Sequence, residues 1–123
     1  MNHIINLVNG FQFRALESEA HFQQRVESLL NIYDWYWFAQ PTTQEQVKNR
    51  GRAGYPDLTA VSRDGRILFI ELKKQGKYPT LAQQMWLSQL SVNGHVAVYV
   101  WRPSDWPEIV RVLSNTPTDG GAA

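Results

Sequence analysis

The clearest periodic pattern in the chain begins at Ser18. From there the apolar residues recur at the spacing of one helix face, and they are Phe22, Val26, Leu29, Leu30 and Tyr33. The Ser18 hydroxyl is suited to accept a hydrogen bond from the first helical turn, so Ser18 is a natural N-cap. The pattern predicts a helix that ends near Asn31. The aromatic run Trp35–Phe38 that follows is typical of a β-strand.

The two ends of the chain lack such a pattern. Residues 1–17 mix apolar side chains with Asn and Gln but keep neither the helix nor the strand period for long. We interpret them as an N-terminal extension that either forms a dimer arm or covers the core. Residues 114–123 are polar and glycine-rich, and we expect a disordered tail.

A β-hairpin is predicted in the middle of the chain, after a polar segment from Gln40 to Gly54 that reads as a loop. The strand-like runs Asp57–Ser62 and Arg66–Lys73 are separated by Arg63-Asp64-Gly65. Three residues with glycine in the left-handed position are a common hairpin loop. With that loop Ser62 faces Arg66, and the numbers of every facing pair add to 128.

The remaining elements complete an α/β pattern. Apolar residues at helical spacing predict a second helix up to Asn93-Gly94, and they are Leu81, Met85, Trp86, Leu87 and Leu90. His95–Trp101 is an almost continuous apolar strand, and Ser104 after Pro103 is expected to cap a last short helix. The order helix, strand, hairpin, helix, strand, helix predicts a mixed β-sheet flanked by helices, in one domain of 123 residues.

Composition excludes several classes of protein. The chain has no cysteine, so disulfides, thiolate metal sites and cysteine nucleophiles are ruled out, and any metal must bind oxygen or nitrogen. No stretch approaches the roughly 18 apolar residues of a membrane span, and we expect a soluble protein of a reducing or indifferent compartment. The net charge is only +1, but eight of the twelve Lys and Arg residues lie between Lys48 and Lys77. A local basic patch is therefore compatible with the neutral total.

The predicted hairpin brings charged residues together at one end. Glu71 and Lys73 lie at the end of an interior strand and share one face, about 6 to 7 Å apart. Because the numbers of facing residues in this hairpin add to 128, Asp57 is expected opposite Glu71. Facing Cβ atoms lie about 4.5 to 5.5 Å apart, and two carboxylates this close repel unless a cation such as Mg²⁺ or Mn²⁺ lies between them. A two-residue loop would instead place Asp57 opposite Leu72 and weaken the argument.

A simpler interpretation exists for each acid alone: Asp57 as a turn residue after Pro56, and Glu71 with Lys73 as a surface ion pair. Taken jointly, they favour a metal-dependent site for phosphodiester hydrolysis, in which the metal activates water and Lys73 orients or deprotonates that water.

Two further side chains are candidates for this site. Glu19, in the first turn of the first helix, could be another metal ligand, or an acid favoured there by the helix dipole. Gln83 shares a helix face with Trp86 and Leu87, so its amide could contact the metal site or its lysine, or simply point to solvent.

Four cations flank the proposed acids in the sequence: Arg50, Arg52, Lys74 and Lys77. They are candidates for phosphate contacts, although charge runs are more often solvated loops. Tyr55 and Tyr78 could either stack on bases or pack.

Four sequence blocks in this order resemble the VRR-NUC family of the PD-(D/E)XK nuclease superfamily. They are Gly54-Tyr55-Pro56-Asp57-Leu58, Phe69-Ile70-Glu71-Leu72-Lys73, Gln83 through Trp86-Leu87, and Val98-Tyr99-Val100-Trp101-Arg102-Pro103. The resemblance covers roughly residues 18–113. It implies a restriction-endonuclease-like core and a domain with those bounds.

The resemblance also implies roles for particular residues. Glu19, Asp57 and Glu71 would be the acidic site residues, with Glu19 preferred over Glu17 for its spacing to the helix stripe. Lys73 would be the catalytic lysine and Gln83 the motif glutamine, and the carbonyl of Leu72 would also bind metal.

The same resemblance also implies a function. Stand-alone members, common in phages and bacteria, are homodimeric Holliday-junction-resolvase-like nucleases, and this short chain looks like that kind. We therefore expect a Mg²⁺- or Mn²⁺-dependent endodeoxyribonuclease acting on branched DNA, in the cytoplasm of a bacterial or phage-infected cell. The alternatives are a nicking or flap nuclease with the same site, as in longer relatives, and a DNA-binding accessory protein without catalysis.

Overall fold

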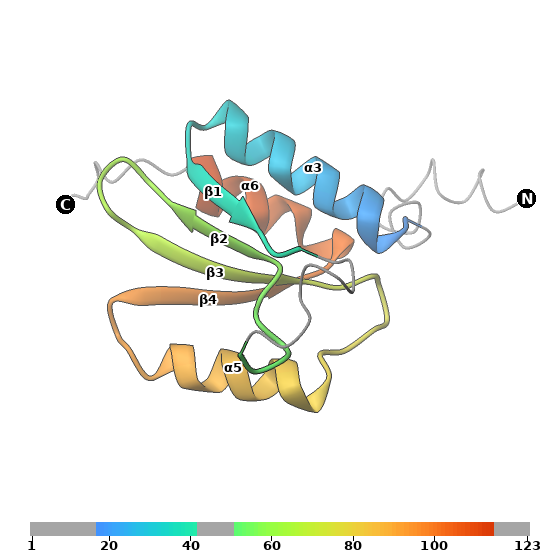
Figure 1. Cartoon of the computed structure of the whole chain (residues 1–123). Coiled ribbons are helices and arrows are strands. Elements are labelled where there is room, and N and C mark those ends of the chain that lie inside the picture. The colour runs from blue at the N-terminus through green and yellow to red at the C-terminus, as the bar shows by residue number, and fades with distance from the viewer. Residues whose placement is uncertain (1–16, 42–50, 115–123) are drawn as a thin grey trace, which may run out of the picture.

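The computed structural model describes residues 17–41 and 51–114, which form one four-stranded sheet with helices on both faces (Figure 1). In chain order the elements are α3 (Glu19–Ile32), β1 (Tyr36–Ala39), β2 (Leu58–Val61), β3 (Ile67–Leu72), α5 (Leu81–Ser91), β4 (Val96–Trp101), the 3₁₀ turn η1 (Pro103–Asp105) and α6 (Trp106–Ser114). The strands lie in the order β1-β2-β3-β4. The first three are antiparallel and β3 pairs with β4 in parallel. The predicted mixed α/β sheet is confirmed.

Helix α3 follows the sequence pattern closely. Ser18 is its N-cap, and the Ser18 Oγ accepts a hydrogen bond of 3.0 Å from the backbone N–H of His21. Phe22, Val26 and Leu30 are buried against the sheet. The helix extends to Ile32, one residue past the predicted end at Asn31.

The hairpin prediction is confirmed in its register. Leu58 pairs with Ile70 and Val61 pairs with Ile67, so each pair of numbers adds to 128. The N–H of Ser62 donates to the carbonyl of Arg66 at 2.9 Å, which closes the three-residue loop. Gly65 in that loop has φ of 91°, a conformation that costs other residues more. The paired register ends at Leu58 and Ile70, and its next step would set Asp57 opposite Glu71; beyond the ladder, Asp57 contacts β3 through the N–H of Leu72.

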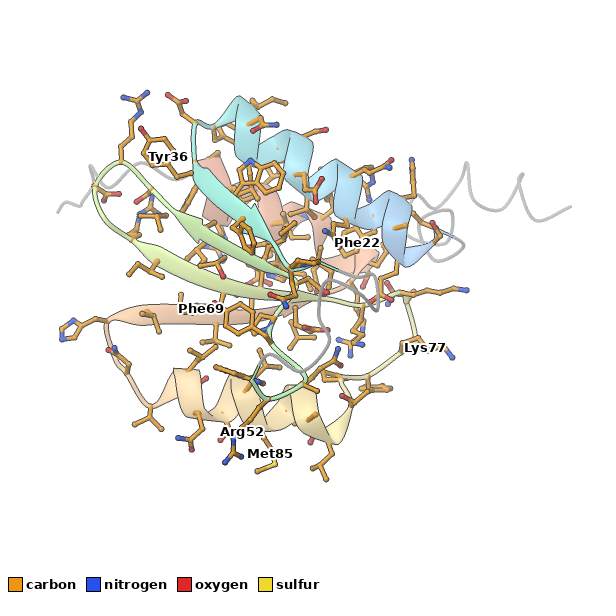
Figure 2. The ribbon with its side chains drawn as sticks, in the orientation of Figure 1. Phe22, Tyr36, Arg52, Phe69, Lys77 and Met85 are labelled. Carbon is orange, nitrogen blue, oxygen red and sulfur yellow. The ribbon has the colours of Figure 1, made fainter. Side chains whose placement is uncertain are left out.

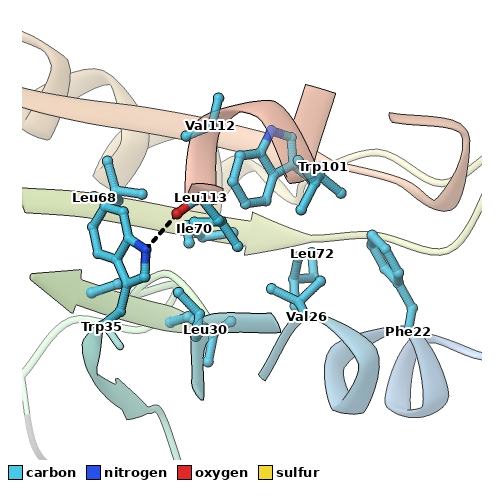
Figure 3. Close-up of a cluster of buried hydrophobic side chains, with 13 residues drawn as sticks. Phe22, Val26, Leu30, Trp35, Leu68, Ile70, Leu72, Trp101, Val112 and Leu113 are labelled. Atoms are coloured by element: carbon cyan, nitrogen blue, oxygen red, sulfur yellow. Dashed lines mark hydrogen bonds between the residues drawn. The ribbon is translucent and has the colours of Figure 1, made fainter. Parts of the chain in front are cut away.

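The hydrophobic core lies between the sheet and the helix pair α3 and α6 (Figure 3). Leu68, Ile70 and Leu72 of β3 alternate inward, as the two-residue period of a strand requires. Trp35 precedes β1 and is buried, and its indole Nε1 donates to the carbonyl of Leu113 at 2.9 Å. This bond connects the end of α6 to the entry of β1.

Helix α5 covers the opposite face of the sheet and is less buried than its pattern predicts. Of the expected stripe, Leu87 is buried, but Leu81 and Met85 are 72% and 57% exposed. The reason is that α5 packs mainly on the β4 side, so part of its apolar surface has no sheet beneath it. On the same sheet face, Tyr36 and Phe38 of β1 are also exposed.

One predicted cap is wrong. Ser104 lies inside η1 rather than before α6, and its N–H donates to Gln75 Oε1 at 3.0 Å. The N-cap of this turn is Arg102, and its N–H donates to the carboxylate of Asp105 at 2.8 Å. Pro103 has a backbone angle suited to the first position of a helical turn, so the turn starts before Ser104.

The N-terminal extension, the polar tail and the centre of the Gln40–Gly54 loop lie almost wholly outside the described residues. Within the described ranges, no helix has the length and apolar character needed to cross a membrane.

Candidate active site

Asp57 and Glu71 meet at the open end of the hairpin, as the register requires. The carboxylate of Asp57 is fixed by the strand next to it, because its Oδ2 accepts the backbone N–H of Leu72 at 2.8 Å. Glu71 is 1% exposed although it is an acid. Among the described residues neither of its carboxylate oxygens has a hydrogen-bond partner. A buried carboxylate in this state is costly unless a cation compensates it.

Lys73 supplies part of that compensation. Its Nζ lies 3.5 Å from Glu71 Oε2, and its side chain is 12% exposed. The backbone of Lys73 is held as well, since its N–H donates to the carbonyl of Trp101 at 2.9 Å, one step beyond the β3–β4 ladder. The structure therefore brings together the three residues Asp57, Glu71 and Lys73 that the sequence placed on one face.

The electrostatics of the pair follow from burial and like charge. Burial, then the neighbouring Asp57, raises the pKa of Glu71 to about 8, against the lowering effect of Lys73. Burial also raises the pKa of Asp57, although the Leu72 N–H and Lys73 oppose the increase. Both carboxylates can thus be ionised together near neutral pH only with additional positive charge between them.

Glu17 and Glu19, at the start of α3, have different environments. Burial raises the pKa of Glu19, Lys73 lowers it and Asp57 raises it, so Glu19 lies within electrostatic range of the site. Glu17 is engaged elsewhere: its carboxylate accepts two hydrogen bonds from Arg25, at 2.7 and 2.9 Å, and contacts His21 Nδ1 at 2.6 Å. Arg25 in turn stacks on the ring of Trp106, 4.0 Å from its centroid. Of the two acids, Glu19 is the one whose pKa is affected by Lys73 and Asp57.

Glu19 nevertheless does not join a ready-made ligand set. In residues 17–41 and 51–114, no three His, Cys, Asp or Glu side chains are grouped to hold a metal ion. The oxygen donors that the structure brings together here are those of Asp57 and Glu71, beside the Leu72 backbone.

Gln83 has a structural contact that the sequence also signals. Its Oε1 accepts the backbone N–H of Thr80 at 2.8 Å, and its own N–H donates to Thr80 Oγ1 at 3.2 Å. This is a capping box at the start of α5. A threonine followed three residues later by glutamine is the usual sequence mark of that motif, and the sequence reasoning did not use it. The contact leaves the amide nitrogen of Gln83 for other partners.

The flanking cations are partly described. Arg52, Lys74 and Lys77 are exposed, whereas Arg50 lies outside the described residues. A further cation, Arg102, joins this group: its Nε donates to the carbonyl of Lys77 at 2.9 Å, and its guanidinium lies 4.8 Å from the Tyr78 ring centroid. The sequence analysis missed Arg102 as a candidate, because it lies 25 residues from Lys77 in the chain.

Tyr55 and Tyr78, each a candidate either for stacking on bases or for packing, have different environments. Tyr55 packs inside: its hydroxyl is 3.0 Å from Thr59 Oγ1, and its ring meets Trp86 edge-on at 5.0 Å. Tyr78 is 76% exposed. Tyr78 is thus the one with a ring accessible to a ligand.

Gly54 sets the position of the loop that leads to Asp57. Its φ is 100°, and a Cβ built on it would lie 2.6 Å from the backbone carbonyl of Ala82 and 2.8 Å from the nitrogen of Gln83. Only glycine allows the loop to approach the first turn of α5 this closely.

Replacing Gly54 by alanine is therefore expected to lower the free energy of unfolding by about 2 to 4 kcal/mol, from backbone strain and overlap together. Gly76→Ala is the matched control: its φ is 86°, but nothing lies within 4 Å of the added Cβ. Urea unfolding of the two variants measures the difference. Equal destabilisation would show that the contact with α5 adds nothing to the strain.

The architecture and the site together define the class: an α/β protein with a restriction-endonuclease-like core. Two solved structures have this fold. A "VRR_NUC domain" aligns with a TM-score of 0.61 and 20% identity over 76% of this chain and 94% of its own. A "VRR_NUC domain protein" aligns with a TM-score of 0.52 and 26% identity over 77% of this chain and 87% of its own.

These structures confirm the resemblance to the VRR-NUC family that the sequence motifs indicate. No protein-family model matches the sequence. No curated protein matches it either.

Proposed function

We propose that this protein is a Mg²⁺- or Mn²⁺-dependent endodeoxyribonuclease that acts on branched DNA. The observation that carries the proposal is the buried Glu71 carboxylate, which faces Asp57 and, within residues 17–41 and 51–114, has Lys73 as its one oppositely charged partner. An enzyme that needs no cation there would gain stability from a neutral residue at this position.

The donor set fits a hard divalent cation. Asp57, Glu71 and the carbonyl of Leu72 offer oxygen ligands, the type that Mg²⁺ and Mn²⁺ prefer. Glu19, in the first turn of α3, is proposed as a further acid of that centre, since Lys73 and Asp57 both affect its pKa. When bound, the metal would lower the pKa of water and neutralise the charge that develops on the scissile phosphate.

Each protein residue then has a separate task. The Leu72 N–H keeps the Asp57 carboxylate oriented. Lys73 places a positive charge beside Glu71 and, as an ammonium, would orient the attacking water; only its neutral amine form would deprotonate that water. Arg52, Lys74, Lys77 and Arg102 supply positive charge for the DNA backbone around the site. Arg50, outside the described residues, is proposed for the same role.

The preference for branched DNA and the homodimer rest on the resemblance to stand-alone VRR-NUC proteins. A symmetric dimer would present two such sites and would cut two strands of a four-way junction in paired fashion. A nicking or flap nuclease would use the same residues without paired cuts.

The test compares a labelled four-way junction with the matching linear duplex, in Mg²⁺, Mn²⁺ or EDTA. Asp57→Asn is the control variant, because asparagine keeps an oxygen that can accept the Leu72 N–H but loses the charge. We expect paired cuts confined to the junction, absent in EDTA and in Asp57→Asn.

Other results separate the alternatives. Metal-dependent cutting of both DNAs would keep the nuclease and discard the junction preference. Binding without cutting in every metal would identify an accessory protein.

A further inference from the structure

A cavity of about 730 Å³ lies between the loop before Asp57 and the outer surface of α5. Its lining residues are Arg52, Ala53, Ala82, Met85, Trp86 and Gln89. Figure 2 shows the labelled side chains of Arg52 and Met85 next to each other beside α5. The volume lies within the range of about 300 to 1,000 Å³ that small-molecule sites have.

The walls of this cavity are held in place by contacts on both sides. The indole Nε1 of Trp86 donates to the carbonyl of Arg52 at 3.2 Å. Gly54 abuts the backbone of Ala82, and Tyr55 meets the Trp86 ring edge-on at 5.0 Å. The cavity is therefore a formed feature of the fold, which lowers the cost of ordering it around a ligand.

The lining combines three kinds of chemistry. Met85 and Trp86 offer a polarisable thioether and an aromatic ring. Gln89 is exposed, and its amide both donates and accepts, as the edge of a nucleobase does. Within the described part of the chain the guanidinium of Arg52 forms no ion pair, so its charge is available to a phosphate.

The cavity is also close to the proposed catalytic residues along the chain. Arg52 precedes Asp57 by five residues, which span at most about 18 Å when fully extended. Duplex DNA advances about 3.4 Å per base pair. A nucleotide in the cavity would thus lie within roughly five steps of the phosphate at Asp57 and Glu71.

We infer that this cavity takes an unpaired nucleobase of the DNA substrate. The inference rests on the proposed function and adds how the site would distinguish branched from continuous DNA. A base inside a duplex must be unstacked at a cost of a few kcal/mol before it can enter such a site, and this cost is smaller for an unpaired base and for a base at a branch point, where stacking on one side is interrupted. Met85 and Trp86 contact the base, Gln89 pairs with its edge and Arg52 holds its phosphate.

The test measures binding in EDTA, so that no turnover is needed. The probes are a fluorescein-labelled duplex with one unpaired thymidine, the same duplex with an abasic unit at that position, and the fully paired duplex. We expect the wild-type protein to bind the unpaired thymidine about tenfold more tightly than the abasic unit, the size of one base-stacking contact.

Two variants test whether the preference for the unpaired thymidine arises in this cavity. Ala53→Phe fills the cavity from an exposed position and should remove the preference, with DNA binding otherwise kept. Ser88→Phe adds the same side chain to an exposed position of α5 that does not line the cavity, and should leave the preference intact. Circular dichroism checks that both variants fold.

The outcomes distinguish this inference from the proposed function. Equal wild-type binding to the thymidine and abasic probes would overturn the inference alone, since junction cleavage could still occur. A preference that persists in Ala53→Phe would also overturn it, because the base would then bind elsewhere. A change in oligomeric state in Ala53→Phe, with the base preference unchanged, would assign the cavity to a second copy of the chain. Failure to bind any of the three DNAs would overturn the inference alone, because the proposed function is tested separately by junction cleavage in Mg²⁺ or Mn²⁺.

Discussion

Replacing Glu71 by glutamine is expected to abolish DNA cleavage and, without metal, to stabilise the fold at alkaline pH. The variant keeps the size of the side chain but removes a charge that is 1% exposed and faces Asp57. If Glu71 holds the metal, the rate of cleavage should fall about a thousandfold or more, which corresponds to roughly 4 kcal/mol of transition-state stabilisation.

The stability part of this prediction has a defined pH window. The pKa of Glu71 rises from 4.5 to about 8 on folding. Between these two values the native state binds more protons than the unfolded state, so wild-type stability falls as the pH increases. The decrease in the free energy of unfolding is complete above about pH 8 and amounts to a few kcal/mol. The raised pKa of Asp57 acts in the same direction.

Glutamine at position 71 has no proton to lose, so the variant should lack most of this decrease. The measurement is urea unfolding in EDTA from pH 5 to pH 9, with Glu108→Gln as control. Glu108 is partly exposed and its carboxylate lies 3.9 Å from Arg111, so the control should follow the wild-type profile. If Glu71→Gln also follows it, the buried acid does not carry the pH dependence.

Replacing Lys73 by alanine should lower kcat about a hundredfold or more while changing KM for DNA little. The reason is position: Lys73 Nζ lies 3.5 Å from Glu71, in the site, with only 12% of its side chain exposed. A lysine that orients or deprotonates the attacking water contributes to the transition state and little to binding of the substrate.

Lys74→Ala is the matched control, one residue further along the chain and exposed to solvent. A phosphate-contacting lysine should contribute to affinity, so its removal should raise KM and reduce the slope of log K against log salt by about 1. Single-turnover cleavage and binding at several salt concentrations separate the two variants. If Lys73→Ala and Lys74→Ala both lower only the affinity, Lys73 is a phosphate-binding residue and not a catalytic one.

The proximity of Asp57 and Glu71 was predictable from the sequence because the length of a hairpin loop sets the register of its two strands. Once the loop Arg63-Asp64-Gly65 is assigned, the alternation and the register follow from backbone hydrogen bonding alone. The same local character made α3 predictable, since its N-cap and its buried stripe depend on spacing within one helix.

Other features of the candidate site depended on the tertiary structure. The choice between Glu17 and Glu19 was made by Arg25, which hydrogen-bonds Glu17 and itself stacks on Trp106 of α6. The capping contact of Gln83 was local and could have been predicted. The exposure of Met85 could not, because it depends on how much of the sheet α5 covers.

The sequence by itself determined the elements, the hairpin register and the grouping of Asp57, Glu71 and Lys73, because these depend on hydrogen bonds and side-chain periods over short stretches. The tertiary structure decided how deeply Glu71 is buried, that Glu19 approaches the pair, and that a cavity forms between Arg52 and α5. Burial, electrostatic range and cavities depend on which distant segments pack together, and spacing along one segment carries no information about that packing.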